Sequence, residues 1–271
     1  MTGLLRARLH LGHQTIPYPE GPATFPERFR GRPALHPERC PAGCRQCQEA
    51  CPTEAIQAGA PGALRLDTGA CLFCGLCEEA CPEQAVAFTR DHRLAVRTRA
   101  DLSLAGDAPH LAAALDARMR RLFGRSLRLR QVSAGGCNGC EAELNAAGNV
   151  QFDLSRFGIQ FVASPRHADG LVVTGPVTAA MRAPLLATWE AVPAPRLLVA
   201  VGACACSGGP VAGGQACGRG LEEVIPGVPV DLWVPGCPPH PVTFLDGLLR
   251  LLGRIPAAPP PAPGHSPAAA P

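Results

Sequence analysis

Residues 71–82 read CLFCGLCEEACP, four cysteines at C-x2-C-x2-C-x3-C spacing with a proline directly after the last one. The short gaps let consecutive thiolates converge on one 4Fe-4S cluster, while the fourth thiolate crosses to a neighbouring cluster. Gly75 permits positive φ and a close approach of the backbone, and Pro82 turns the chain away so that Cys81 points across. The stretch therefore predicts one half of a two-cluster fold.

A second copy of this motif lies about thirty residues earlier, where residues 40–52 read CPAGCRQCQEACP. Its first gap is one residue longer, so the loop is expected to bulge at residues 42–43. Because each copy gives three cysteines to one cluster and one to the other, the repeat predicts two 4Fe-4S clusters. One would be bound by Cys40, Cys44, Cys47 and Cys81, and the other by Cys71, Cys74, Cys77 and Cys51.

Structural zinc is the alternative for this region, since it also takes four thiolates. Two C-x2-C pairs would suffice for a zinc site. Eight cysteines that end in paired Cys-Pro units favour two clusters instead.

The 14 cysteines are the main compositional signal in this chain of 271 residues. The start, MTGLLRARLHLGH, lacks the pattern of a secretion signal, so we expect a cytoplasmic protein whose reduced thiols bind metal. There is no run of 18 apolar residues, so membrane contact is expected only through partner subunits. The formal charge of +3 rests on scattered arginines and gives no electrostatic case for nucleic acid.

Composition divides the chain into four segments. Residues 1–100 contain a Pro- and Arg-rich arm, expected to be extended and to pack against another part of the protein, and then the cysteine repeat. Residues 101–127 include PHLAAALDARMRRLF, whose apolar residues recur at helical spacing and predict a linker helix. Residues 128–255 form the second large segment. Residues 256–271 are rich in Pro and Ala and are expected to be disordered.

The second large segment alternates β-rich runs with helical patterns, which predicts a parallel sheet covered by helices and an α/β fold class. The expected strands lie within LRLRQVS, GIQFVAS, GLVVTG, RLLVAVG and VDLWVPG, and the expected helices within TAAMRAPLLATWEAV and HPVTFLDGLLRLLGR.

This segment also contains GGCNGCEAE at residues 135–143, whose two cysteines need two more ligands. The candidates are Cys204, Cys206, Cys217 and Cys237. Loops that follow parallel strands converge at one edge of a sheet, so Cys137, Cys204 and Cys237 can meet, with Cys140 one turn into the next helix. The pattern predicts a third 4Fe-4S site. Cys206 stays an alternative to Cys204, which is favoured because it follows the strand directly.

The N-terminal part resembles the bacterial-type two-cluster ferredoxins, which implies an α+β ferredoxin domain. It is more similar to the ferredoxin-like subunit of respiratory complex I and of formate hydrogenlyase-type hydrogenases. FRGRPALHPERC at residues 29–40 looks like the arm that leads into the first motif of those subunits. The resemblance covers about residues 17–98.

The C-terminal part resembles the family that unites the 20 kDa subunit of complex I with the small subunits of NiFe hydrogenases. FGIQFVASPRHADGLVVTGPVT, VGACACSGG and VPGCPPHPVTFLDGLL carry this resemblance over about residues 128–254. It implies a flavodoxin-like domain with cluster ligands at Cys137, Cys140, Cys204 and Cys237. Complex I subunits have adjacent cysteines at the first motif, whereas hydrogenase subunits have C-x2-C, as in CNGCE here.

The two resemblances together imply a fusion of subunits that are normally separate chains. The expected function is an iron-sulfur electron-transfer subunit of a NiFe hydrogenase-like oxidoreductase with three 4Fe-4S clusters. The absence of a twin-arginine signal implies the cytoplasmic, complex I-like class, peripheral to the inner face of the cell membrane. A NiFe-type large subunit, with the catalytic centre, further complex I-like subunits and a redox donor or acceptor protein are the implied partners.

Two alternatives remain open. The first is a complex I-like NADH/quinone oxidoreductase subunit of the 20 kDa type, which adjacent cysteines would have supported. The second is a free polyferredoxin-type electron carrier without a stable catalytic partner.

A few single residues have both a functional and a structural interpretation. Glu141 could handle protons near the partner's metal centre or simply favour a helix start. Arg166 and His167 could face a partner cavity or cap a turn. Cys217 is expected to be a small buried hydrophobe, and His240 stands where relatives tend to carry arginine.

Overall fold

The computed structural model describes residues 2–58, 64–106 and 111–255. A five-stranded parallel sheet with the strand order β10-β9-β8-β6-β7 forms the centre of the C-terminal part and confirms the predicted α/β fold class. Its strands are β6 (Leu127–Ser133), β7 (Ile159–Phe161), β8 (Gly170–Thr174), β9 (Leu197–Val201) and β10 (Leu232–Val234). All of them lie within the stretches that the sequence marks as strands.

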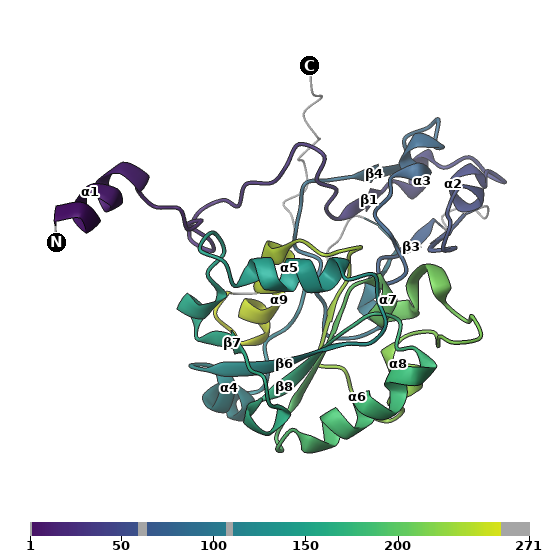
Figure 1. Ribbon diagram of the computed structural model, residues 1–271. Coiled ribbons are helices and arrows are strands. Elements are labelled where there is room, and N and C mark those ends of the chain that lie inside the picture. Colours follow the sequence, from purple (N-terminus) through teal and green to yellow (C-terminus); the bar gives the residue numbers. More distant parts are fainter. Residues whose placement is uncertain (1, 59–63, 107–110, 256–271) are drawn as a thin grey trace.

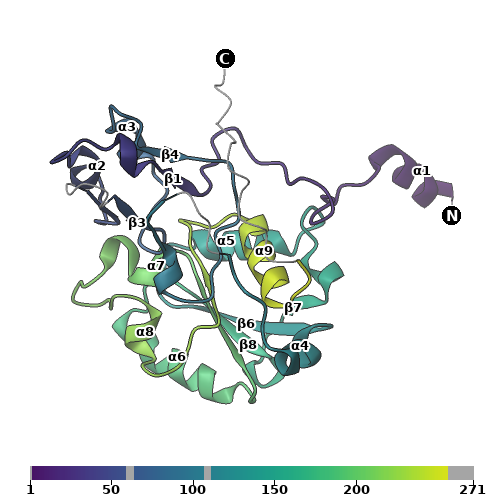
Figure 2. The ribbon, with the colours of Figure 1, turned by 180° about the vertical axis from the view of Figure 1, so that it is seen from behind.

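Helices cover both faces of this sheet (Figure 1, Figure 2). They are α5 (Gly139–Ala147), α6 (Ala179–Ala191), α7 (Ala203–Ser207), α8 (Leu221–Val224) and α9 (Pro241–Leu251). Helices α5 and α9 contact each other over one face, and α6 and α8 pack against the other. Val199 points into the first core and Ala200 into the second. Burial on both faces explains why the three strands β8, β9 and β10 are nearly continuous apolar runs.

The cysteine repeat folds into a small ferredoxin-like module with two short antiparallel sheets. Strand β1 pairs with β4, and β3 lies between β2 and β5. One-turn helices α2 and α3 occupy corresponding positions in the two copies and contact each other. The bounds are β1 (Pro33–Leu35), α2 (Gln46–Glu49), β2 (Ile56–Gln57), β3 (Arg65–Asp67), α3 (Leu76–Glu79), β4 (Val86–Phe88) and β5 (Ser103–Leu104).

Short 3-10 turns connect several of these elements. They are η1 (Pro37–Arg39), η2 (Ala100–Leu102), η3 (Leu154–Phe157), η4 (Pro165–His167) and η5 (Gly209–Val211). Direct backbone bonds join the two modules, because Val96 and Trp233 exchange N–H···O bonds of 3.0 and 2.9 Å.

The N-terminal arm differs in part from the expected extended segment. Helix α1 (Thr2–Leu11) opens the chain and extends away from the body of the molecule (Figure 1). Leu, Ala and Arg favour helix, and the first proline comes only at residue 17, so local propensity accounts for this helix. Beyond it the arm is largely non-helical and crosses both modules, as expected.

The segment 101–127 was expected to be a linker helix, but its described residues, 101–106 and 111–127, are helical only over η2 and α4 (Ala117–Phe123). The backbone N–H groups of Ala112 and Leu115 donate to the carbonyls of Ala95 and Leu251, respectively. These N–H groups therefore bond to distant segments and not within a helix. Asp116 caps α4 by accepting a bond from the Met119 N–H. Tertiary hydrogen bonds therefore override the helical spacing. The tail expected to be disordered, residues 256–271, lies outside the described residues.

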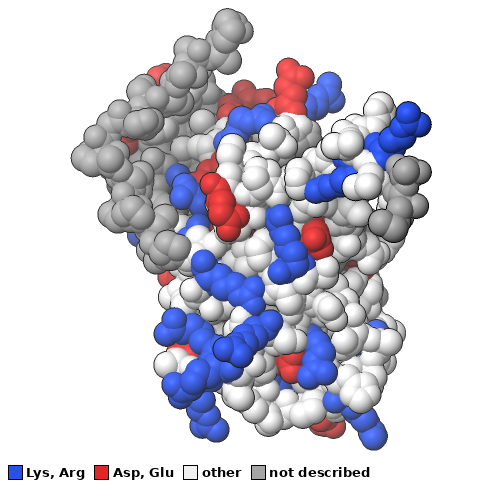
Figure 3. Space-filling view, turned by 90° about the vertical axis from the view of Figure 1, so that its left-hand side faces the viewer, with Lys and Arg blue, Asp and Glu red and all other residues white. Residues whose placement is uncertain are grey.

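None of the helices that the structure describes has the length and apolar character needed to span a bilayer. The face of the molecule in Figure 3 has basic side chains gathered toward its lower end, with a few acidic side chains between them. The arginines are therefore less evenly spread than the sequence suggested.

Candidate metal centres

Four cysteines approach one another at the carboxyl edge of the parallel sheet. They are Cys137 after β6, Cys140 in the first turn of α5, Cys204 at the start of α7 and Cys237 after β10. Burial raises the pKa of Cys140 to about 12, and Glu141 and the other three thiols add to this rise. We call these four cysteines the third thiol group.

Glycines leave space for the sulfur atoms of this group. A Cβ at Gly202 would collide with Sγ of Cys140, and one at Gly209 would lie 2.8 Å from Sγ of Cys204. Both glycines have positive φ, of 89° and 58°. The backbone therefore approaches the thiols more closely than a residue with a side chain would allow.

The eight N-terminal cysteines fall into two groups. Burial raises the pKa of Cys47 to about 11, and Cys81, Cys40 and Cys44 add to the rise. Burial likewise raises the pKa of Cys71 to about 12, with smaller contributions from Cys77, Cys51 and Cys74. We call Cys40, Cys44, Cys47 and Cys81 the first thiol group, and Cys51, Cys71, Cys74 and Cys77 the second. Gly43, in the loop of the first copy where a bulge is expected, has a φ of +80°.

Backbone N–H groups point at several of these sulfur atoms. Ala55 donates to Sγ of Cys51 and Ala85 to Sγ of Cys81, both at 3.2 Å, at corresponding places in the two copies. Phe73 donates to Sγ of Cys71 at 3.3 Å. Such bonds stabilise thiolate ligands and tune a bound iron-sulfur cluster. Backbone N–H donors therefore lie beside thiols of both N-terminal groups. These residues are suited to bind iron-sulfur clusters.

All 14 cysteines are free thiols. Within residues 2–58, 64–106 and 111–255, no group of three or more His, Cys, Asp or Glu side chains is arranged to hold a single metal ion. A cluster spreads its four thiolates around several iron ions. Because burial raises the pKa of Cys47, Cys71 and Cys140, these three thiols are protonated at neutral pH without metal, and their binding as thiolates would release protons.

Cys206 and Cys217 lie outside the three groups. Cys206 is 2% exposed and packs in the core beneath α6 and α8. Burial raises its pKa, and the Arg99 guanidinium partly opposes the rise. Cys217 is half-buried, forms a backbone bridge with Thr178 and lies near Cys204.

Glu141 lies beside the third thiol group, in the first turn of α5, and is only 6% exposed. Burial disfavours its charged form, but bonds from Ser133 and Thr174 outweigh this effect and hold its pKa below the ordinary value. The Thr174 hydroxyl donates to Oε1 of Glu141 at 2.5 Å. Glu141 is thus an ionised, well-bonded carboxylate, and not a group that titrates near neutral pH.

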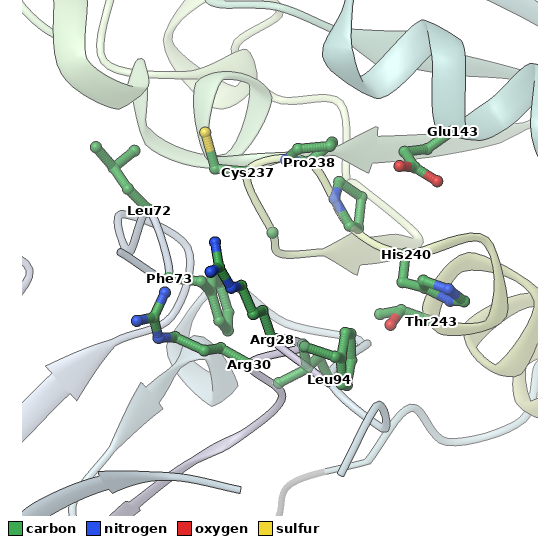
Figure 4. Close-up of a pocket in the computed structure, with 13 residues that line it drawn as sticks. Arg28, Arg30, Leu72, Phe73, Leu94, Glu143, Cys237, Pro238, His240 and Thr243 are labelled. Carbon is green, nitrogen blue, oxygen red and sulfur yellow. The ribbon is translucent and has the colours of Figure 1, made fainter. Parts of the chain in front are cut away.

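A cavity of about 240 Å³ lies between the second and third thiol groups (Figure 4). Leu72 and Phe73 line it from the loop of the second group, and Cys237 and Pro238 line it from the loop after β10. Burial raises the pKa of Cys237, and Cys137 and Cys74 add to the rise, so Cys74 is within electrostatic range of the third group.

Arg28 and Arg30 of the arm line the same cavity, and Figure 4 shows both guanidinium groups extended into it. Sequence reasoning missed these residues. The arm has no periodicity and lies far along the chain from the loops that it contacts, so no local pattern marks them.

His240 follows this loop and has a structural role. Its Nδ1 accepts the Val242 N–H at 3.2 Å and caps α9. Its ring packs against Phe25, Phe29 and Phe152. Burial, with His92 nearby, lowers its pKa to about 4, so the ring is neutral at physiological pH.

Arg166 and His167 belong to η4, directly before β8. They are exposed and line a cavity with residues 193–195, at the amino edge of the sheet. This edge is opposite to the third thiol group, so neither side chain takes part in that site.

Comparison with known proteins identifies two family matches. Residues 137–251 match the family described as "NADH ubiquinone oxidoreductase, 20 Kd subunit", and residues 39–86 match the "4Fe-4S dicluster domain". The two matches cover the third thiol group and the cysteine repeat, respectively.

Among similar curated proteins, formate hydrogenlyase subunit 7 of Escherichia coli is 43% identical over 53% of this chain and 55% of its own length. The chain therefore spans only about half of that relative. The probable membrane-bound hydrogenase subunit mbhJ of Pyrococcus furiosus is 39% identical over 51% of this chain and 81% of its own length. An NADH-quinone oxidoreductase subunit of Heliobacterium modesticaldum is 43% identical over 43% of this chain and 65% of its own length.

Proposed function

Because the chain belongs to the family of the 20 kDa subunit of NADH ubiquinone oxidoreductase, we propose that it is an electron-transfer subunit of a NiFe hydrogenase-like complex. Three 4Fe-4S clusters, one at each thiol group, would supply one-electron carriers. The catalytic centre would lie on a partner large subunit, and this chain would contribute no catalytic residue.

The observation that carries this proposal is the position of the second thiol group between the other two. Cys77 and Cys47, one from each copy of the repeat, are near enough for Cys47 to help raise the pKa of Cys77, although burial contributes most. On the other side, Cys74 lies within electrostatic range of Cys237. The chain thus holds its twelve proposed ligands in one continuous series from the ferredoxin-like module to the parallel sheet.

The exposure of the third thiol group supports a partner at that site. Cys137 and Cys237 are both exposed, although the strands that lead to them, β6 and β10, contribute buried residues to the core. A cluster bound there needs protection from water, because solvent exposure shifts its potential. A large subunit covering this edge would provide that protection and bring its own metal centre close.

The hydrogenase assignment rests on the C-x2-C spacing of Cys137 and Cys140 and on the similarity to two hydrogenase-type subunits. The alternative is a quinone-reducing complex I-like enzyme, and the similarity to the NADH-quinone oxidoreductase subunit of Heliobacterium modesticaldum favours it. In both cases we propose that the chain is cytoplasmic and that partner subunits hold it at the inner face of the membrane.

Metal analysis of the complex purified through this chain distinguishes the two candidates. We expect nickel in the co-purifying large chain and about twelve iron atoms in this one. Absence of nickel, together with quinone-dependent activity, would favour the complex I-like function. A chain that purifies alone in a stable soluble form would favour a free carrier. A colourless preparation without iron would contradict all three.

The choice between Cys204 and Cys206 as a ligand has a direct test. We expect Cys204→Ala to lose the third cluster, which lowers the iron content to about eight atoms per chain. The matched Cys206→Ala variant should keep about twelve, because that thiol packs in the apolar core. Iron analysis of both variants would contradict the assignment if the two losses were reversed.

A further inference from the structure

The arm is fastened to both modules, so the residues between its two anchors are held in place. On the parallel-sheet side, Tyr18 donates to Oδ1 of Asp246 at 2.5 Å, and Arg156 donates to the Tyr18 carbonyl at 2.6 Å. On the ferredoxin-like side, Gly31 donates its N–H to the Thr89 carbonyl at 2.7 Å. Arg28 and Arg30 lie between these anchors.

Arg30 packs directly on the cluster-binding loop at Gly75. A Cβ built at Gly75 would lie 2.7 Å from Nε of Arg30 and 2.8 Å from its Cζ. Gly75 is buried under this side chain and has a φ of +86°. The glycine therefore has two roles, since it permits the left-handed turn after Cys74 and leaves room for the guanidinium.

Few negative charges offset Arg30. Glu79 of α3 lies 3.9 Å from its Nη2, but this pair is exposed and therefore weak. Glu143 is the one acidic residue among those that line the cavity, and Arg28 adds a second positive charge there. Arginine keeps its charge at any physiological pH.

We propose that Arg30 is an electrostatic tuning residue, which raises the reduction potential of the cluster bound by the second thiol group. This inference rests on the proposed function. Reduction adds one negative charge to the cluster and its thiolates, and a fixed positive charge packed on the binding loop stabilises that state. Through Arg30, the arm thus raises the reduction potential of the second cluster, which lies between the other two.

The test is redox titration of the anaerobically purified complex, followed by low-temperature EPR. We expect Arg30→Gln to lower the reduction equilibrium constant of one cluster about tenfold, which is about 59 mV for a one-electron couple. Arg30→Lys keeps the charge and should restore most of the potential. Glu79→Gln removes the opposing charge and should shift the same cluster in the opposite direction.

Two controls separate this effect from others. Arg118→Gln removes an equal charge from exposed helix α4, outside the cavity, and should leave every potential unchanged. The signal of the second group is identified by its loss in Cys77→Ser, which shows whether that cluster is the one that has moved.

The inference is overturned if all clusters are present and Arg30→Gln leaves their potentials unchanged. It is also overturned if the Gln and Lys variants shift the potential equally, because packing and not charge would then be responsible. Failure of the proposed function gives different results: a complex without nickel still shows clusters to titrate, and a preparation without clusters shows no signals at all.

Discussion

Cys237→Ser is expected to lower the iron content from about twelve to about eight atoms per chain and to remove one of three reducible species. Cys237 reaches the third thiol group from the loop after β10, whereas its partners come from other loops. The two remaining cysteines of the chain, Cys206 and Cys217, belong to no group and leave no substitute at that position. Iron and acid-labile sulfide analysis, with EPR of reduced samples, measures the loss.

Cys217→Ser is the matched control for this variant. It removes a half-buried thiol near the same site but outside the third group, so we expect about twelve iron atoms and all three signals. If Cys237→Ser kept the full iron content and every paramagnetic signal, the third cluster site would be wrong. If Cys217→Ser lost iron and one of the three signals, the proposed ligand set of the third cluster would be wrong.

Asp246→Ala is expected to destabilise the protein by about 3–5 kcal/mol, because it removes one partner of a buried ion pair. Asp246 is 0% exposed and Arg250 is 4% exposed, and Nε of Arg250 donates to Oδ2 of Asp246 at 2.8 Å. Without the carboxylate, the buried guanidinium loses the acceptor of this charged bond. The Tyr18 hydroxyl also loses its acceptor, which weakens the anchor of the arm.

Anaerobic denaturant unfolding followed by tryptophan fluorescence measures this effect. Tyr18→Phe is the matched comparison, since it removes one hydrogen bond to a charged group and should cost only about 1.5–3 kcal/mol. An Asp246→Ala variant within about 1 kcal/mol of the wild type would show that the pair behaves like an exposed one.

Much of the fold could be predicted from local patterns. Strand β6 occupies the whole predicted stretch LRLRQVS, whose apolar and polar residues largely alternate. Strand β9 follows from RLLVAVG, because a strand buried on both faces is a continuous apolar run. The cysteine spacing within each motif is also a local pattern. From it we expected which thiols would lie near one another in the folded chain. The grouping of Cys47 with Cys81 is an example.

Other expectations failed where distant segments compete for the backbone. Helical spacing predicted a linker helix, but Leu115 bonds to Leu251 instead, and residues 111–116 are not helical. The arm was expected to be extended, yet α1 forms at its start. For the linker, the deciding neighbour lies far along the chain, and no local pattern contains it. For α1 the deciding factor is local, because the helix propensity of its own residues favours it.

By itself, the sequence determined the α/β fold class, the two-copy cysteine module and the convergence of the later cysteines at one sheet edge. These follow from short-range spacing and from a general rule about parallel sheets. Only the tertiary structure decided that Arg30 lies on Gly75, that Tyr18 reaches Asp246, and that Cys206 faces the core while Cys204 faces the other thiols. Such contacts depend on how segments without periodicity pack across the fold, and no local pattern encodes that packing.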